Sequence, residues 1–235
     1  MSKAIVTESK LTAIADAVRD RFGVTGQKTL DELAEIIEAH LPKGLQQVDY
    51  IEASGTQYIN TNRFGINGLK MKMEIVGSPQ NNEGYFGAIT DNKHNRYDMI
   101  YYDGLYFCCG TSNNDDDILA DISAYASAQM IIEQGVTNQN LVVNGDTVKT
   151  FNSFTNTSSY PIYLFWRATE STYGMLKGKA RIYYCELYSD GDIVCQFIPC
   201  YRKSDKVIGL YDIINGQFYT NAGSGTFTCY PAPPA

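Results

Sequence analysis

Leu41-Pro42-Lys43-Gly44 is the stretch at which the hydrophobic pattern of this chain changes its period. Before it, Leu11, Ile14, Val18 and Phe22 recur at the spacing of one face of an amphipathic helix. After it, short alternating runs are separated by Asn-Gly and Asp-Gly pairs, which are typical of antiparallel strands joined by tight turns. The 235 residues therefore predict a small helical unit followed by one large β-rich unit.

The segment before this stretch has the pattern of a helical hairpin. Its first helix is predicted over about residues 8–21, and its second opens with a capping box at Thr29-Leu30-Asp31-Glu32 and ends at Pro42. Two short helices are marginal in water on their own, so their apolar stripes need a partner: the β-rich unit, copies of the hairpin or another protein. The residues expected to form this attachment or oligomerisation surface are Leu11, Ile14, Val18, Phe22, Leu30, Leu33, Ile36 and Ile37.

The segment after this stretch contains four hairpin signals and several further strand-like runs. The signals are Asp103-Gly104, Asn144-Gly145, Asp190-Gly191 and Asn215-Gly216, and the runs are 69–76, 85–89 and 160–166. Together they predict a mainly β fold of about ten strands or more, an antiparallel sandwich or jelly roll. The predicted organisation is a helical hairpin at 1–41, a linker at 42–46, a jelly-roll β-sandwich at 47–230 and an extended proline-rich tail at 231–235.

Composition and charge argue against several classes of partner. The net charge is −7, and a protein that binds nucleic acid or an anionic membrane needs a basic face. No apolar run approaches the roughly 20 residues that span a bilayer, and the N-terminus lacks the apolar core of a secretory signal. None of the six cysteines forms a CxxC pair, so we expect buried, reduced thiols in a protein made in the cytoplasm.

Motifs for catalysis are absent from the sequence. It has no nucleophile elbow, phosphate-binding loop, HExxH or dinucleotide-binding glycine pattern. Glycosidases on sandwich folds use two closely placed carboxylates, but the glutamates of the β-rich unit form no alternating acidic cluster. We therefore predict a protein that is not an enzyme, although carboxylates from different strands could still converge.

The candidate ligand-binding residues are mainly aromatic. A ring face can stack on a sugar, so Trp166, Tyr97, Tyr102 and the loop residue His94 are predicted to bind ligand. Core packing is the alternative for each ring, and strand alternation sends neighbouring tyrosines to opposite faces. No cofactor is predicted, although Asp115 and Asp117, in the one acidic cluster, are weak candidates for binding Ca²⁺.

Two resemblances to known proteins cover most of the chain. The segment 45–61 resembles the opening of a laminin-G-like, concanavalin-A-type jelly roll found in phage and prophage proteins of gut Firmicutes. Four later segments are similar to the C-terminal part of that domain: 179–185, 197–203, 209–212 and 218–227. The segment 10–19, with Leu30-Asp31-Glu32-Leu33 after it, is similar to the helical leader of many phage tail and fibre proteins.

These resemblances imply a structural protein of the virion, in a tail fibre, the baseplate or a head decoration. The leader would attach to other virion proteins and form a homo-oligomer, for which we expect a trimer. The jelly roll would be displayed outside the particle after cytoplasmic synthesis without a signal peptide, to bind a host-surface glycan. The resemblance supplies no catalytic residues. The alternatives are a glycan-degrading enzyme on the same scaffold and a purely architectural domain without a ligand.

Overall fold

The computed structural model describes almost all of the β-rich unit. The described residues are 41–90, 95–111, 119–126, 128–136, 138–154, 158–169 and 176–234. The chain divides into two units at Leu45, and the described residues belong almost wholly to the second, Gln46–Ala235. The predicted helical hairpin, with all eight of its attachment residues, lies outside the described residues, as do His94, Asp115 and Asp117.

The larger of two sheets contains 11 strands. Its main order is β11-β10-β9-β4-β15-β16-β17-β18, with β2 beside β15, β19 beside β2 and β1 beside β16. All its pairings with a stated direction are antiparallel. The strands are β1 (Leu45–Gln47), β2 (Tyr50–Ser54), β4 (Gly68–Ile75), β9 (Gln129–Gln134), β10 (Asn140–Val143), β11 (Asp146–Thr150), β15 (Lys179–Ser189), β16 (Asp192–Arg202), β17 (Ile208–Asp212), β18 (Gln217–Thr220) and β19 (Thr228–Tyr230).

The smaller sheet contains eight strands in the order β3-β12-β5-β6-β7-β8, with β13 and β14 also beside β5. Only β13 and β14 run parallel to their neighbour. The strands are β3 (Ile59–Asn60), β5 (Glu83–Thr90), β6 (Asn95–Tyr101), β7 (Leu105–Gly110), β8 (Leu119–Asp121), β12 (Tyr163–Leu164), β13 (Ala168–Thr169) and β14 (Leu176–Lys177). The predicted mainly β, antiparallel class is confirmed, and the described residues contain one short 3-10 helix, Ser123–Tyr125, and no α-helix.

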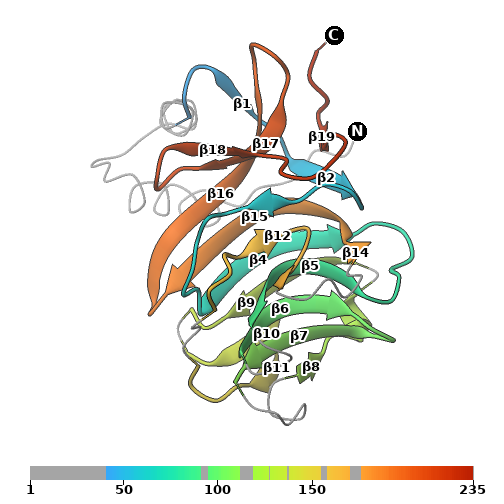
Figure 1. The fold of residues 1–235 in the computed structure, drawn as a ribbon, viewed down its shortest axis with the longest axis vertical. Helices are drawn as coiled ribbons and strands as arrows, with labels where there is room; N and C mark the ends of the chain where they lie inside the picture. The colour runs from blue at the N-terminus through green and yellow to red at the C-terminus, as the bar shows by residue number, and fades with distance from the viewer. Residues whose placement is uncertain are drawn as a thin grey trace, which may run out of the picture. The chain divides into compact units, whose positions relative to one another are not determined.

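The two sheets share one hydrophobic core. Figure 1 shows β5 to β8 in front of β9 to β11, and buried side chains from both sheets belong to a single cluster. The rings of Phe86, Tyr97 and Phe107 form the aromatic part of this core, with centroids 5.6–5.8 Å apart. Met71 and Ile132 contribute to it from the larger sheet, and both are fully buried. Burial of one face of each sheet leaves the two outer faces for function.

All four predicted hairpins are present, but the predicted two-residue turn occurs in only two of them. Asn144-Gly145 and Asp190-Gly191 join strands that pair directly on either side, and all four residues have positive φ. This is the conformation that Asn-Gly and Asp-Gly favour in a tight hairpin.

The other two hairpins have longer loops, in which side chains accept hydrogen bonds from amide groups of the loop. Between β17 and β18 the loop has four residues, and the Asp212 carboxylate accepts hydrogen bonds from the Ile214 backbone amide at 3.1 Å and the Asn215 side-chain amide at 2.6 Å. Between β6 and β7 the Asp103 amide donates to Asn81, and three residues form the loop.

We expect Gly87→Ala to reduce the free energy of unfolding by more than about 2 kcal/mol. Gly87 in β5 has φ of +119°, and an added Cβ would overlap the backbone of Tyr97 and Asp98 on β6. Gly44→Ala is the control, because nothing lies within 4 Å of a Cβ there. Chemical denaturation measures both variants, and equal stabilities would contradict this packing of β5 against β6.

Candidate functional site

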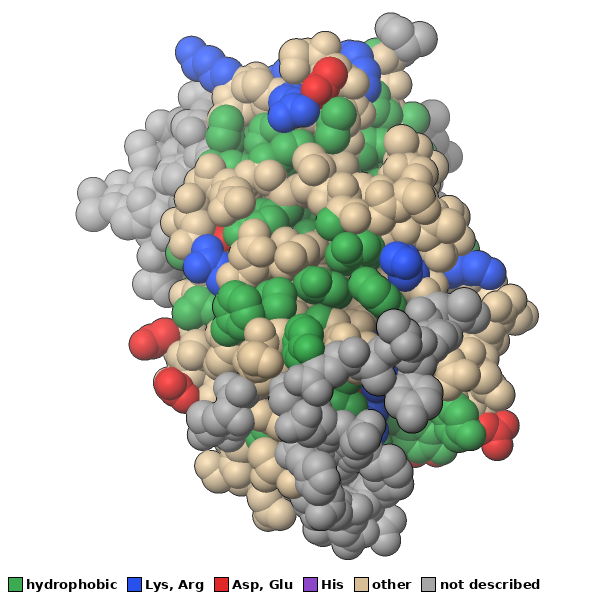
Figure 2. Space-filling model, viewed as in Figure 1, with side chains coloured by type: hydrophobic (Ala, Val, Ile, Leu, Met, Phe, Trp, Pro, Cys, Tyr) green, Lys and Arg blue, Asp and Glu red, His purple; other side chains and the backbone are tan. Residues whose placement is uncertain are grey.

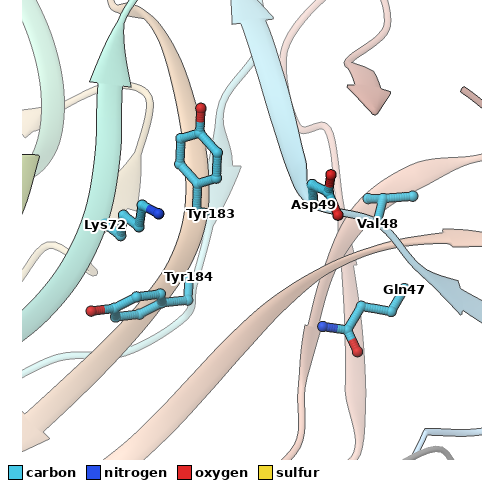
Figure 3. A pocket seen from close by; sticks show the side chains of 6 residues that line it. All are labelled: Gln47, Val48, Asp49, Lys72, Tyr183 and Tyr184. Carbon is cyan, nitrogen blue, oxygen red and sulfur yellow. The ribbon is translucent and has the colours of Figure 1, made fainter. Parts of the chain in front are cut away.

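A groove of about 690 Å³ lies on the larger sheet, beside the start of the β-rich unit. Its walls come from the end of β1 and the turn that follows it, from β4 and from β15 (Figure 3). The figure shows Lys72 and the two tyrosines on one side and the other three side chains facing them. The lining residues are Gln47, Val48, Asp49, Lys72, Tyr183 and Tyr184.

A β-bulge in β15 places two consecutive tyrosines in this groove. Along β4, Ile182 pairs with Met73 and Tyr184 pairs with Lys72, which leaves Tyr183 as the extra residue. Ile182 is fully buried in the core, whereas both tyrosines are half-buried. Regular alternation would send one of two neighbouring residues inward, so the bulge is what brings both rings to the outer face.

The groove combines two ring systems with two opposite charges. The Lys72 ammonium lies 4.9 Å from the centroid of the Tyr183 ring, and the Tyr183 hydroxyl donates a 2.8 Å hydrogen bond to Glu74. Partial burial and this bond raise the pKa of the Tyr183 hydroxyl above its ordinary value. Among the described residues, neither Lys72 nor Asp49 forms an ion pair.

A charged and aromatic network extends the groove along the same face. Arg181 donates to Glu52 at 2.6 Å and to Glu74 at 3.3 Å, and its guanidinium carbon lies 4.9 Å from the centroid of the Tyr50 ring. The hydrogen bond to Glu52 is the main cause that raises the pKa of Arg181. Tyr50 in turn stacks on Tyr230, which is 60% exposed. Carboxylates from β2 and β4 do converge here, but both are bound to one guanidinium.

A second aromatic group lies at an edge of the smaller sheet and is called here the tryptophan cluster: Tyr58, Tyr163, Trp166 and Lys177. Trp166 stacks on Tyr163 with ring centroids 5.7 Å apart. Tyr58 contacts Trp166 in an edge-on arrangement, with ring centroids 5.0 Å apart. The Lys177 ammonium lies 4.5 Å from the Trp166 centroid and 5.7 Å from that of Tyr58. Such a cation–ring contact contributes about 0.5–1 kcal/mol when exposed. All four side chains are half-buried and therefore accessible in part.

The aromatic residues that we predicted to bind ligand differ in their burial. Tyr97 is a wrong prediction: its side chain is fully buried between Phe86 and Phe107, because Asp98 and not Tyr97 faces away from the core. Tyr102 is 60% exposed in the loop between β6 and β7, and its role stays a prediction. Trp166 is half-buried, as its alternative interpretation allowed.

The sequence reasoning missed the groove residues. The signal for them was present in Ile182-Tyr183-Tyr184-Cys185, where two polar aromatic residues separate two residues of the apolar alternation. Asp49 and Gln47 carried no such signal, because their position depends on the turn that leads into β2.

A buried ionic cluster lies on the outer side of the smaller sheet. Asp98 is fully buried and accepts hydrogen bonds from Arg96 at 3.2 Å and 3.3 Å and from Arg167 at 2.8 Å. Arg96 also donates to the Cys108 sulfur at 3.1 Å. Burial alone would raise the pKa of Asp98, but the two guanidinium charges outweigh it and lower the pKa. Two positive charges therefore share one carboxylate.

Asp98→Asn should lower the free energy of unfolding at neutral pH by about 3–5 kcal/mol, because it removes the fully buried carboxylate to which Arg96 and Arg167 both donate. Folding lowers the pKa of Asp98 below its unfolded value of about 3.9. The stabilising contribution of the ionised Asp98 carboxylate is therefore complete above that pH, and it is lost as the pH falls through the pKa of the folded protein. The difference from wild type should thus shrink below about pH 4. Asp192→Asn, at the exposed first residue of β16, is the control; a loss of stability independent of pH would contradict the ionic account.

Comparison with protein-family models, with curated proteins and with solved structures found no match. Within the described ranges, no helix is long and apolar enough to cross a membrane, and no group of three or more His, Cys, Asp or Glu side chains is placed to hold a metal ion. All six cysteines are free, and five of them are buried while Cys229 is half-buried. The geometry of the groove and the resemblances in the sequence therefore carry the functional argument.

Proposed function

We propose that this chain is a non-enzymatic structural protein of a phage virion that displays a lectin-like domain for adhesion to a host-surface glycan. The finer fold that we propose for the β-rich unit is a laminin-G-like, concanavalin-A-type jelly roll. Two antiparallel sheets with one core are compatible with it, and the segments at 45–61 and 209–212 resemble that family. The single observation that carries the binding proposal is the groove beside the β15 bulge.

The groove has the set of groups that saccharide binding requires. A pyranose presents apolar C–H faces, which pack on aromatic rings such as Tyr183 and Tyr184, and hydroxyls, which both donate and accept. Asp49 supplies an acceptor, Lys72 supplies donors and the Gln47 amide supplies both. The rings would hold the sugar plane, and the polar groups would select its hydroxyl pattern.

The N-terminal segment supplies the virion part of the proposal. Its two apolar stripes would attach the chain to other virion proteins, in a tail fibre, the baseplate or a head decoration, and would assemble it as a trimer. The lectin-like unit would then be presented in several copies, which raises the avidity for a repetitive surface without any new contact.

We expect Lys72→Gln to weaken binding of the full-length protein to its glycan about fivefold or more, because a charged donor is lost from the groove. Lys70→Gln is a matched control two residues earlier on β4, outside the groove and paired with Glu133 at 3.3 Å. The glycan is first chosen on an array of bacterial surface saccharides, and both variants are then measured by titration calorimetry. No binding to any saccharide, or equal loss in both variants, would contradict this use of the groove.

A substitution in the first apolar stripe tests the assembly proposal. Ile14→Glu should convert the full-length trimer into a monomer, because a carboxylate on the apolar face opposes its burial. Thr12→Glu, on the polar side of the same predicted helix, should leave the trimer intact. Light scattering coupled to size exclusion gives both masses, and a wild-type monomer would refute the proposed trimer.

A glycan-degrading enzyme is the second candidate, and the convergence of Glu52 and Glu74 on Arg181 is the observation in its favour. Paired carboxylates perform glycoside hydrolysis, but these two are each occupied by the same guanidinium. Release of reducing sugar by the full-length protein, abolished by Glu52→Gln or Glu74→Gln, would select this candidate.

A further inference from the structure

We infer that the ligand of the groove is an unbranched oligosaccharide that continues past the groove, across β15 and β2, to Tyr230 on β19. The inference rests on the proposed glycan adhesion and deepens it, because it names the form of the saccharide: a chain bound along its length, not a single sugar. It is carried by two rows of side chains that cross these strands on the outer face of the larger sheet.

The first row is aromatic, and strand register places it across four strands. Tyr230 on β19 lies opposite Tyr50 on β2, and the two rings are stacked with centroids 6.2 Å apart. The Tyr50 centroid lies 5.3 Å from that of Tyr183 on β15. The Lys72 ammonium, from β4, lies over the ring of Tyr183. This aromatic row therefore runs from Tyr230 into the groove through contacts between neighbouring strands.

The second row is polar and lies two residues away from the aromatic row along each strand. Thr228 pairs with Glu52, Glu52 pairs with Arg181, and Arg181 pairs with Glu74. Side chains two residues apart on a strand point to the same face, so this polar row lies beside the rings at a distance of about 7 Å. The residues between the two rows point the other way, as the fully buried Ile182 does.

The two rows match the two kinds of surface that a sugar chain presents. The rings would pack on the apolar C–H faces of successive sugars, and hydroxyls along one edge of the chain would lie over the polar row. Glu52 and Glu74 both accept hydrogen bonds from Arg181, and all three side chains are 25–29% exposed. An ionised carboxylate has about four acceptor positions, so hydroxyls can bind there without breaking these ion pairs.

The length of the aromatic row sets the size of the ligand. Tyr230 and Tyr183 lie on strands that flank β2, so two strand spacings, about 10 Å in all, separate their backbones. This distance exceeds the width of one pyranose ring. A single sugar therefore cannot contact both tyrosines, whereas a chain of about three units can.

Tyr230 is held in place for such a contact. Its carbonyl accepts a 2.6 Å hydrogen bond from the amide of Asp49, which lines the groove. Its ring stacks on Tyr50, and the Arg181 guanidinium carbon lies 4.9 Å from the centroid of Tyr50. A ring that is fixed before binding loses little conformational freedom on contact, so Tyr230 can contribute to affinity although it is 60% exposed.

The face of the smaller sheet is ordered differently. Figure 2 shows apolar side chains gathered across the middle of that face, over β12 and β5, with Lys and Arg side chains on either side of them. On the larger sheet, by contrast, rings and charged groups follow each other along the same strands. That order provides a contact for every unit of a chain that crosses the strands, which is why we assign the oligosaccharide to the larger sheet.

A length series of one saccharide tests the inference. A linear saccharide selected on an array is supplied from monosaccharide to hexasaccharide and titrated into the full-length protein by calorimetry. Wild-type affinity should rise about tenfold or more up to the trisaccharide or tetrasaccharide and then level off. Tyr230→Ala should remove most of this rise and leave the affinity for the monosaccharide unchanged, whereas Tyr230→Phe should keep the rise. Phe64→Ala, at a ring that is 55% exposed between β3 and β4 and belongs to neither row, is the control and should match wild type.

Lys72→Gln separates this inference from the proposed function, because it should weaken binding of every length alike. If wild type binds all lengths equally and Lys72→Gln still weakens them, the groove is the whole site and the extension is overturned. A loss in Tyr230→Ala that is the same at every length also overturns it, because Tyr230 would then act through the groove. So does a change of mass in light scattering of Tyr230→Ala, which would make the aromatic row a contact between copies. Absence of binding to any saccharide refutes the proposed function and this inference together. Unfolding curves of the Tyr230 variants that match wild type exclude loss of the fold as the cause.

Discussion

Strand β15 determines which side chains lie on the inner and outer faces of the larger sheet. It must bury one row of side chains while it pairs with β4, β16 and β2. Its inward residues Ala180, Ile182, Cys185 and Leu187 are separated by two, three and two positions. A strand of strict period two cannot keep all four inward, so the register shift at Tyr183 maintains the core. The same shift adds one residue to the outer face. Core packing and the groove therefore have a common cause.

The two outer faces place charge in different environments. On the larger sheet, Arg181 joins Glu52 and Glu74 at the surface, where the three side chains are 25–29% exposed and ion pairs contribute little to stability. On the smaller sheet, Asp98 is fully enclosed between two arginines, where loss of one partner is costly. The first arrangement suits a surface that exchanges contacts with a ligand. The second fixes the position of groups beside the tryptophan cluster.

The sequence predicts local features of this fold well and their combination poorly. Asn144-Gly145 and Asp190-Gly191 form the expected turns because φ preference is a property of the residues themselves. Asn215-Gly216 does not; it lies in a longer loop, in which the Asp212 carboxylate accepts hydrogen bonds from amide groups. Tyr97 was expected at a ligand site because alternation defines two faces of a strand without saying which face the other sheet covers. The groove depends on which face is covered and on a bulge in β15, so the sequence indicated only its pair of tyrosines.

The central claim is that the bulge in β15 builds a saccharide-binding groove, and chemical-shift mapping of the 235-residue chain tests it most directly. Backbone amides are followed while a neutral oligosaccharide from the host surface is added. The account predicts saturable shifts concentrated at residues 47–49, at Lys72 and at Tyr183 and Tyr184. Shifts confined to other parts of the β-rich unit, or no shift with any neutral host oligosaccharide, would contradict it.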